Sequence, residues 1–315
     1  MRTAATGVAI LLAVSCGPAP DAPWVRVPCP ITDPLHNGYF LDNQYGWIVT
    51  YGTGRVLRTE DGGTSWSLAA TLEPQFYEDL YFLTPEEGWL CGEGGVLLHT
   101  TDGGRSWDSR RVGSEQTAHY GIDFGGSDRA FLVGMDMGRR RASFFESRDR
   151  GQTWHARSDS LDARMLEPIQ FLNAGRGFIA GNRAVLRTND GGASWQECDV
   201  GVQGTIRGLH MLDERTGWVV GHNGLVLRTS DGGQTWIEAP SFTTNRLRGV
   251  RFLDAMEGYI VGDRDQQPGS LWRTRDGGAS WQAVPSVRPN LHRLLISPKA
   301  LWAVGDSGTI LRRPR

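Results

Sequence analysis

The chain has 315 residues and a formal net charge of −2, and it contains 42 glycines and 12 tryptophans. Glycine is therefore about 13 % of the chain, roughly twice its usual share, yet it follows no three-residue period and 10 % of the residues are aromatic. These numbers exclude a collagen-like chain and a wholly disordered one, and the near-neutral charge gives no electrostatic basis for binding nucleic acid. A compact protein of short strands and many tight turns remains.

The first residues indicate an export signal and not a part of the fold. Arg2 precedes a small-residue and apolar run over residues 3–14, which is too short to span a bilayer. The run ends in Leu-Ala-Val-Ser-Cys-Gly, which resembles the bacterial lipoprotein signal, where cleavage precedes a cysteine that becomes lipid-modified. We expect a signal peptide over residues 1–15, and a lipidated Cys16 with a proline-rich tether over residues 16–23. The mature protein would then lie in the cell envelope, on the periplasmic or extracellular face; an ordinary cleaved signal with a chance cysteine is the alternative.

One eight-residue pattern recurs six times and predicts a repeat fold. Its first copy, residues 59–66, reads Thr-Glu-Asp-Gly-Gly-Thr-Ser-Trp. Glycine tolerates the positive φ of a tight turn, the carboxylate can accept backbone N–H groups, and the Ser or Thr hydroxyl adds a second local bond. We interpret the pattern as structural; a calcium site is the alternative, although each turn supplies only one carboxylate. The residues are Asp61, Asp102, Asp149, Asp190, Asp231 and Asp276, with Trp66, Trp107, Trp154, Trp195, Trp236 and Trp281.

A second aromatic position lies upstream of each copy and opens a strand, usually after a glycine. It recurs about every 42 residues, and a further strand precedes it, so that each unit holds four short strands, as in a β-propeller blade. The seven aromatic residues are Trp47, Trp89, Phe131, Phe178, Trp218, Tyr259 and Trp302.

The seventh unit ends before its fourth strand, and residues 23–28 align with residues 280–285 of the sixth unit. An N-terminal strand that completes the last blade would remove its open edges. We therefore predict an all-β fold, a single seven-bladed propeller of four-stranded blades over residues 24–315. Cys29, Cys91 and Cys198 form no disulfide framework, because their number is odd and their positions are unrelated.

The innermost strands of a propeller line its central channel, and their entry ends ring the mouth of that channel. Polar, aromatic and charged residues gather two positions before the first apolar residue of each expected inner strand. We expect them to form a binding mouth, acidic on one side and basic across blades 5 and 6; a ring of merely solvated loops is the alternative. The seven residues are His36, Glu78, Tyr120, Glu167, Arg207, Arg248 and His292.

A basic run lies in the longer hairpin loop of blade 3 and consists of Arg139, Arg140 and Arg141. It could contact an acidic partner or anionic lipid head groups, or it could be a solvated loop.

A family resemblance follows from these motifs. The eight-residue pattern is similar to the Asp box, or bacterial neuraminidase repeat. The longer unit, clearest at residues 217–233 as Gly-Trp-Val-Val-Gly-His-Asn-Gly-Leu-Val-Leu-Arg-Thr-Ser-Asp-Gly-Gly, resembles the photosystem II assembly and stability factor family over residues 24–313. The resemblance implies a non-enzymatic assembly propeller on the extracytoplasmic side of a membrane. It also suggests an arginine-bearing patch, for which Arg207 and Arg248 are the matching positions.

Three classes of function remain open. The first is a non-catalytic, monomeric scaffold that binds a membrane or envelope protein, with no cofactor, metal or nucleic acid and with membrane contact through the lipid anchor. The second is a glycan-binding protein or a sialidase-like glycosidase, because Asp boxes occur in sialidases, which use arginines, a tyrosine and carboxylates. The third is a purely structural envelope protein. Nucleophile elbows, phosphate loops and HExxH motifs are absent from the sequence, which favours the first class.

Overall fold

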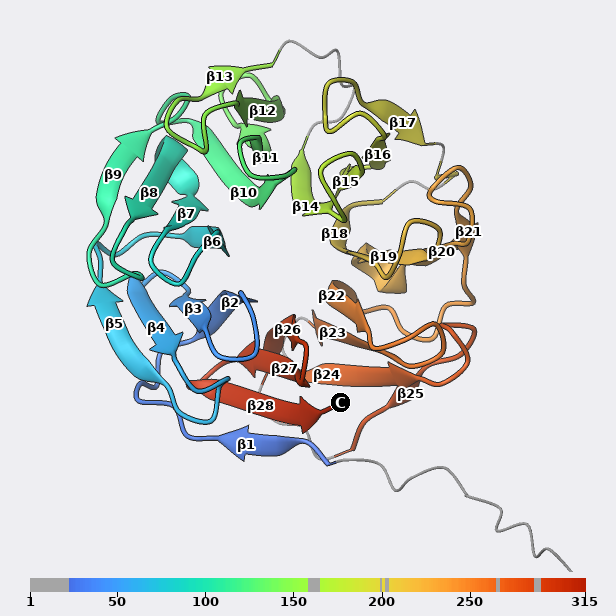
Figure 1. Ribbon diagram of the computed structural model, residues 1–315. Coiled ribbons are helices and arrows are strands. Elements are labelled where there is room, and N and C mark those ends of the chain that lie inside the picture. The colour runs from blue at the N-terminus through green and yellow to red at the C-terminus, as the bar shows by residue number, and fades with distance from the viewer. Residues whose placement is uncertain (1–22, 158–164, 199, 202–203, 265–266, 286–289) are drawn as a thin grey trace, which may run out of the picture.

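The computed structural model describes residues 23–157, 165–198, 200–201, 204–264, 267–285 and 290–315. Over these residues the chain forms seven four-stranded antiparallel sheets, which stand as blades around one central channel (Figure 1). The prediction of a seven-bladed propeller is confirmed.

Each blade begins at the channel and ends at the outer rim, with neighbouring strands antiparallel. The inner strands are β2 (Leu35–Phe40), β6 (Tyr77–Phe82), β10 (Thr117–Phe124), β14 (Leu166–Phe171), β18 (Ile206–Met211), β22 (Arg246–Phe252) and β26 (Leu291–Ser297). The second strands are β3 (Gly46–Thr50), β7 (Gly88–Gly92), β11 (Ala130–Asp136), β15 (Gly177–Gly181), β19 (Gly217–Gly221), β23 (Gly258–Arg264) and β27 (Ala300–Gly305).

The third strands are β4 (Arg55–Thr59), β8 (Val96–Thr100), β12 (Arg141–Ser147), β16 (Ala184–Thr188), β20 (Val226–Thr229), β24 (Gln267–Thr274) and β28 (Thr309–Pro314). The outer strands are β5 (Ser67–Thr71), β9 (Asp108–Arg111), β13 (His155–Ala156), β17 (Gln196–Cys198), β21 (Ile237–Glu238), β25 (Gln282–Ala283) and β1 (Val25–Val27). Two single 3₁₀ turns, η1 (Glu93–Gly95) and η2 (His222–Gly224), connect second and third strands in blades 2 and 5.

The six eight-residue repeats connect the third strand of a blade to its outer strand, and each aspartate closes its own turn. In blade 4 the carboxylate of Asp190 accepts the Thr188 hydroxyl at 2.7 Å, and the backbone N–H and hydroxyl of Ser194 at 2.9 and 2.6 Å. The N–H of Gly192 donates to the Thr188 hydroxyl at 2.8 Å. The same four bonds recur in the other five turns. The turns are therefore self-contained hydrogen-bonded units.

The last glycine of each turn packs against the second-strand aromatic ring of the preceding blade. A Cβ added to Gly192 would lie 2.3 Å from the Phe131 ring, and one added to Gly63 would lie 2.3 Å from Trp302. Both glycines also have a positive φ, of 81° and 83°, which other residues rarely adopt. Glycines and large aromatic rings therefore meet at the junctions between blades, which accounts for part of the high glycine and tryptophan content.

Blade 7 closes the ring as the sequence predicts. The N-terminal strand β1 pairs with β28, from Val25 opposite Arg312 to Val27 opposite Ile310, and Figure 1 shows the blue β1 beside the red β28. Trp24 packs edge-on against Tyr259, with 5.5 Å between ring centroids. The chain thus enters blade 7 from its rim and from the face opposite to the start of the inner strands.

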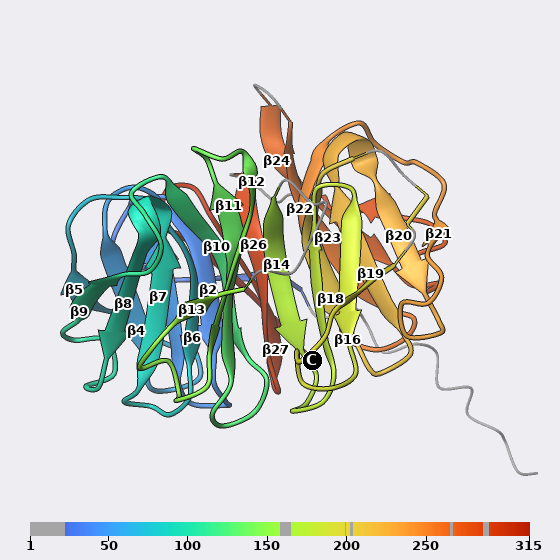
Figure 2. The same cartoon turned by 90° about the horizontal axis from the view of Figure 1, so that it is seen from above.

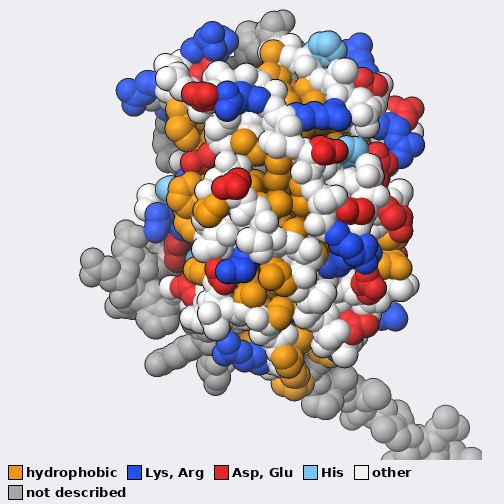
Figure 3. All heavy atoms as spheres, turned by 90° about the vertical axis from the view of Figure 1, so that its left-hand side faces the viewer, with side chains coloured by type: hydrophobic (Ala, Val, Ile, Leu, Met, Phe, Trp, Pro, Cys, Tyr) orange, Lys and Arg blue, Asp and Glu red, His pale blue; other side chains and the backbone are white. Residues whose placement is uncertain are grey.

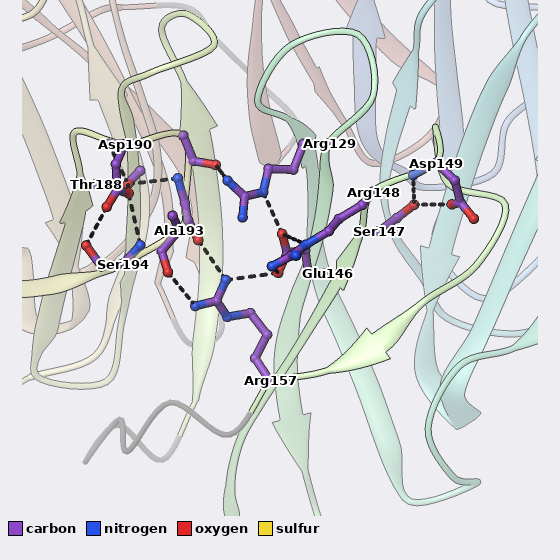
Figure 4. Close-up of polar contacts among 12 residues, drawn as sticks. Arg129, Glu146, Ser147, Arg148, Asp149, Arg157, Thr188, Asp190, Ala193 and Ser194 are labelled. Carbon is purple, nitrogen blue, oxygen red and sulfur yellow. Dashed lines mark hydrogen bonds and ion pairs between the residues drawn. The ribbon is translucent and has the colours of Figure 1, made fainter.

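The junction between blades 3 and 4 has an acidic side chain where other blades have a basic one. Arg58 and Arg228 in the third strands of blades 1 and 5 lie over the rings of Trp47 and Trp218, but blade 3 has Glu146 at that position. Figure 4 shows that three arginines surround this carboxylate. They are Arg129 at 2.5 Å, Arg148 at 2.9 Å and Arg157 at 3.0 Å.

Two of these arginines also hold the neighbouring turn. Arg129 donates to the carbonyl oxygen of Gly191 at 2.8 Å, and Arg157 donates to those of Gly192 and Ala193 at 2.7 and 3.0 Å. Arg129 additionally lies over the Phe131 ring. A buried acid thus replaces the arginine that most other blades have at this position, and arginines from elsewhere in blade 3 restore the contact.

The outer wall carries side chains of mixed character, and two hairpins lie at the same face of the ring. Figure 3 shows basic, acidic and apolar side chains interspersed on the wall that faces left in Figure 1. The hairpins β11–β12 and β23–β24 both lie at the face where the inner strands begin, and Figure 2 shows β24 rising above the ring there.

Candidate functional site

A β-bulge interrupts every inner strand near its start. In blade 1, Leu35 pairs with Thr50 and Asn37 pairs with Val49, so that His36 has no partner in the ladder. An extra residue of this kind bends the strand and re-aims its side chain. The bulged residues are the seven predicted mouth residues: His36, Glu78, Tyr120, Glu167 (together with Pro168), Arg207, Arg248 and His292.

All seven side chains line one cavity of about 270 Å³ at the entry end of the channel. We call this cavity and its lining the channel mouth. Its remaining lining residues are Tyr51, Glu93, Met165, His222, Arg246 and Arg293.

The charges of the channel mouth are divided between its sides. Glu78 and Glu93 come from blade 2, whereas Arg246 and Arg248 come from blade 6. Glu167 of blade 4 forms an ion pair with Arg207 of blade 5. Arg293 lies 3.6 Å from the second oxygen of Glu167. The mouth thus holds four arginines, where alignment of the inner strands alone predicts two.

Several of these side chains are held by neighbours within the mouth. His36 Nε2 lies 2.9 Å from the Glu78 carboxylate. Burial opposes ionisation of Glu78, but the hydrogen bond and charge of His36, together with the charges of Arg293 and Arg207, hold the pKa of Glu78 below its usual value. Arg248 donates to Asp263 at 2.6 Å. His292 lies 2.7 Å from Asp306, and its burial lowers its pKa. Hydrogen bonds and ion pairs within the mouth therefore hold these side chains in place.

Three lining residues that the inner-strand alignment misses share one sequence position. Tyr51, Glu93 and His222 each stand four residues after the aromatic residue of the second strand. The second strand runs antiparallel to the inner strand, so its last residues lie beside the bulge. These three residues can be identified from the sequence by their common position, four residues after the aromatic residue of the second strand.

A second cavity of about 340 Å³ continues down the channel. In its wall Asp79 accepts the backbone N–H of Ile122 at 3.1 Å, and Asp123 accepts that of Phe171 at 2.7 Å. Burial raises the pKa of Asp79 to about 6 and that of Asp123 to about 7. Each carboxyl group thus ties its inner strand to the next blade.

Basic groups occupy the opposite side of this deeper cavity. Arg251 donates to the carbonyl oxygens of Leu209 and Val250 at 3.1 and 2.9 Å, and burial lowers its pKa to about 10. The division between acidic and basic sides therefore extends from the mouth into the channel.

The basic loop of blade 3 lies at the same face but not among the residues that line the channel mouth. Arg139 forms an ion pair with Asp136 at 2.7 Å. Arg140 and Arg141 are exposed. The loop is thus a separate basic surface at the tip of the β11–β12 hairpin.

The predicted signal peptide and the predicted lipidation site, Cys16, lie outside the described residues. In the part of the chain that the structure describes, no helix has the length and apolar character of a membrane span. The same part contains no group of three or more His, Cys, Asp or Glu side chains that could hold a metal ion.

Comparison with curated proteins finds photosystem II assembly factors. The chain is 29 % identical over 143 residues to "Photosystem II assembly lipoprotein Ycf48" of Synechococcus sp. (strain CC9902), which covers 44 % of this chain and 41 % of that protein. The matching part therefore spans about two fifths of that relative's length.

Comparison with solved structures finds the same fold. A structure described as "YCF48 bound to D1 peptide" superimposes with a TM-score of 0.71 and 21 % identity, covering 95 % of this chain and 99 % of that one. Virginiamycin B lyase from Staphylococcus aureus, in its catalytically inactive form with Quinupristin, superimposes with a TM-score of 0.75 but 12 % identity, over 93 % of this chain and 99 % of that one. At such identities the likeness shows the fold alone.

The profile of one protein family matches nearly the whole propeller. The family is described as "Photosynthesis system II assembly factor YCF48", and it matches three overlapping segments, residues 18–115, 111–204 and 193–312. This coverage agrees with the repeats, the Asp-box turns and the closed ring of seven blades. The chain belongs to the photosystem II assembly factor YCF48 family.

Proposed function

We propose that the protein is a non-catalytic, membrane-anchored extracytoplasmic monomer whose channel mouth binds a protein partner, as an assembly or stability factor does. One observation carries this proposal. The same bulge recurs in all seven inner strands, yet it presents unlike side chains, of both charges, around a single open cavity. Repetition of the backbone without repetition of the side chains is typical of a binding site grafted on a scaffold.

The chemistry of the mouth suits an acidic or polar segment of a protein. Arg246 and Arg248 of blade 6 both form ion pairs with Asp263, and guanidinium groups such as these bind the carboxylates of a partner well. The structure that is described as YCF48 bound to a D1 peptide supports a protein partner for this chain as well.

The two carboxylates that the inner-strand bulges place in the mouth are unsuited to act as the general acid of a glycosidase. A general acid of a glycosidase needs a raised pKa, whereas the pKa of Glu78 is lowered beside His36. Glu167 forms ion pairs with two arginines, Arg207 and Arg293. We expect the purified protein to cleave neither a fluorogenic sialoside nor a β-glucan.

The position of the N-terminal strand fits an anchored propeller. Val25 enters the ring from the face opposite to the channel mouth. A lipid on Cys16 would then attach the molecule through that face and leave the mouth accessible to a partner. We propose this orientation together with the lipid anchor.

Partner recovery from the native envelope tests the proposed function. The full chain carrying Arg207→Gln and Arg248→Gln should recover at least about tenfold less partner than the wild type, because two charge-assisted contacts are lost. Arg111→Gln on the outer strand β9, whose side chain is 55 % exposed, serves as the control and should recover as much as the wild type. Equal recovery by the mouth variant would contradict the proposal.

A further inference from the structure

We infer that the channel mouth also holds a docking position for a basic side chain of the partner, formed by the carboxylate of Glu93 and the aromatic rings of Tyr51 and Phe76. We call these three residues the acid–aromatic corner. The inference rests on the proposed partner-binding role of the mouth and specifies the charge pattern that the partner must carry.

The backbone fixes the corner in place. Tyr51 and Phe76 form an isolated β-bridge between blades 1 and 2, and the N–H of Glu93 donates to the carbonyl oxygen of Phe76 at 3.0 Å. The centroids of the Tyr51 and Phe76 rings lie 4.7 Å apart, and that of His36 lies 5.0 Å from Tyr51. The backbone bridge and the ring contacts therefore hold Tyr51, Phe76 and Glu93 close together.

The rings stay open to solvent although they are held rigidly. Tyr51 is 47 % exposed and Phe76 is 39 % exposed, while most large apolar side chains of the described residues are buried. Exposed aromatic faces in a fixed position provide contact area at a low cost in conformational entropy.

Glu93 differs from the other acids of the mouth because its carboxylate has no hydrogen bond or ion pair among the described residues. Glu78 has His36, Glu167 has Arg207, and Asp263 has Arg248. Burial and the nearby charge of Glu78 raise the pKa of Glu93. A bound cation would relieve both effects.

A lysine or arginine side chain matches these surroundings best. Its N–H groups can donate to the Glu93 carboxylate while its charge lies over the Tyr51 ring. An anion would be repelled by Glu78 and Glu93, and an apolar group would remove water from a carboxylate without replacing its hydrogen bonds.

The opposite side of the mouth fixes the orientation of the partner. His222 in η2 occupies the position that Glu93 has in η1, and it lies 3.3 Å from Arg207. A segment with a basic residue toward blades 1 and 2 and an acidic residue toward blades 5 and 6 would be complementary to both sides. Such charge complementarity selects one direction of binding.

Selection from a random peptide display library tests the inference even while the partner is unidentified. The full chain, Glu93→Gln, Arg248→Gln and the exposed control Glu115→Gln serve as targets, and thermal unfolding verifies that each is folded. The wild type and the control should enrich peptides that carry Lys or Arg at a fixed spacing from Asp or Glu. Glu93→Gln should lose the basic preference alone, and Arg248→Gln the acidic preference alone.

The outcomes separate this inference from the proposed function. Wild-type selection of acidic peptides without a basic preference, or a basic preference that survives Glu93→Gln, would overturn the corner and leave the proposed function standing. A wild type that enriches no peptide sensitive to either Glu93→Gln or Arg248→Gln would overturn both.

A selected peptide then gives the strength of the contact. Replacing its basic residue by norleucine should weaken binding to the wild type roughly tenfold and binding to Glu93→Gln hardly at all. An equal loss for both proteins would contradict the assignment to Glu93.

Discussion

The turns formed by the eight-residue repeats, which we call the rim turns, recur in nearly every blade, and the bulges of the channel mouth recur in every blade. The two features recur in different ways. At the rim the residue types recur together with the geometry, as Asp190 and Ser194 show in a turn whose bonds are matched in five others. At the mouth the bulge recurs while its residue changes from His36 to Glu78 to Tyr120. The repeats keep the residue type where the geometry of the turn requires it. They vary the residue type where the bulge only sets the direction of a side chain.

The difference also separates stability from recognition. Rim turns are closed by bonds within one turn and by a glycine against a ring of the preceding blade. Mouth side chains bond to each other across blades but leave Glu93 without a partner among the described residues. Substitutions at the rim should therefore cost stability, and substitutions at the mouth should cost binding.

The largest effect on stability is expected for Gly192→Ala. The new Cβ would lie 2.3 Å from the Phe131 ring at a φ of 81°, and strain plus overpacking should cost about 2–5 kcal/mol. Gly94→Ala is the control, because Gly94 has a φ of 71° but nothing within 4 Å of its Cβ position, and it should cost only about 1–2 kcal/mol. Denaturant unfolding measures both, and equal costs would show that the glycine–ring contact contributes nothing.

A smaller loss is expected for Glu146→Gln, which leaves Arg129, Arg148 and Arg157 without their shared carboxylate. Glu146 is buried, so the cost should be about 2–3 kcal/mol. The same change at Glu115, whose ion pair with Arg111 is exposed, should cost less than about 1 kcal/mol. Similar free energies of unfolding for the two variants would argue against the junction that Figure 4 shows.

The rim turns should also set the stability at acid pH. Hydrogen bonds from Ser194 lower the pKa of Asp190 to about 2, and those from Thr235 do the same for Asp231. In the unfolded chain the pKa of an aspartate carboxyl group is about 3.9. Because the folded value is lower, this stabilisation is complete above about pH 4 and is lost as the pH falls toward 2.

Free energies of unfolding, measured from pH 5 to pH 2 at constant ionic strength, test this expected loss of stability. Ser194→Ala removes the hydroxyl that donates to Asp190 at 2.6 Å, so its loss over the same interval should be smaller than that of the wild type. An identical decrease for both proteins would assign the acid sensitivity to other groups.

The smallest effect on stability is expected at the mouth. Arg248 is 35 % exposed in its pair with Asp263, so Arg248→Gln should change the free energy of unfolding by about 0–1 kcal/mol. A loss as large as that of Gly192→Ala would mean that the mouth is needed for the fold, and the distinction between the two regions would fail.

Most of the fold could be predicted because a blade junction uses the same residues each time. Asp61 and Trp47 recur with their spacing, and the missing fourth strand of the last unit matches the strand that contains Val25. The seven mouth positions could be aligned because they stand at one distance from the apolar residues of their strands.

The rest depends on contacts that sequence spacing does not reveal. Glu93 and Tyr51 reach the mouth through the antiparallel partner of the inner strand, not through the inner strand itself. Glu146 interrupts the repeated third-strand pattern, and two of its three arginines stand 17 and 11 residues away in the sequence. Tyr77 and His119 neighbour the predicted mouth in sequence, but they bond instead to Glu73 and Val112.

Site-specific photocrosslinking in the native envelope tests the central claim, that the mouth and not the rim binds the partner. A photoreactive residue replaces Tyr120 in the mouth or Leu68 on β5, which is 43 % exposed on the outer rim. We predict that the Tyr120 position captures one defined protein and that the Leu68 position does not. Capture of that protein from Leu68 alone would contradict the account.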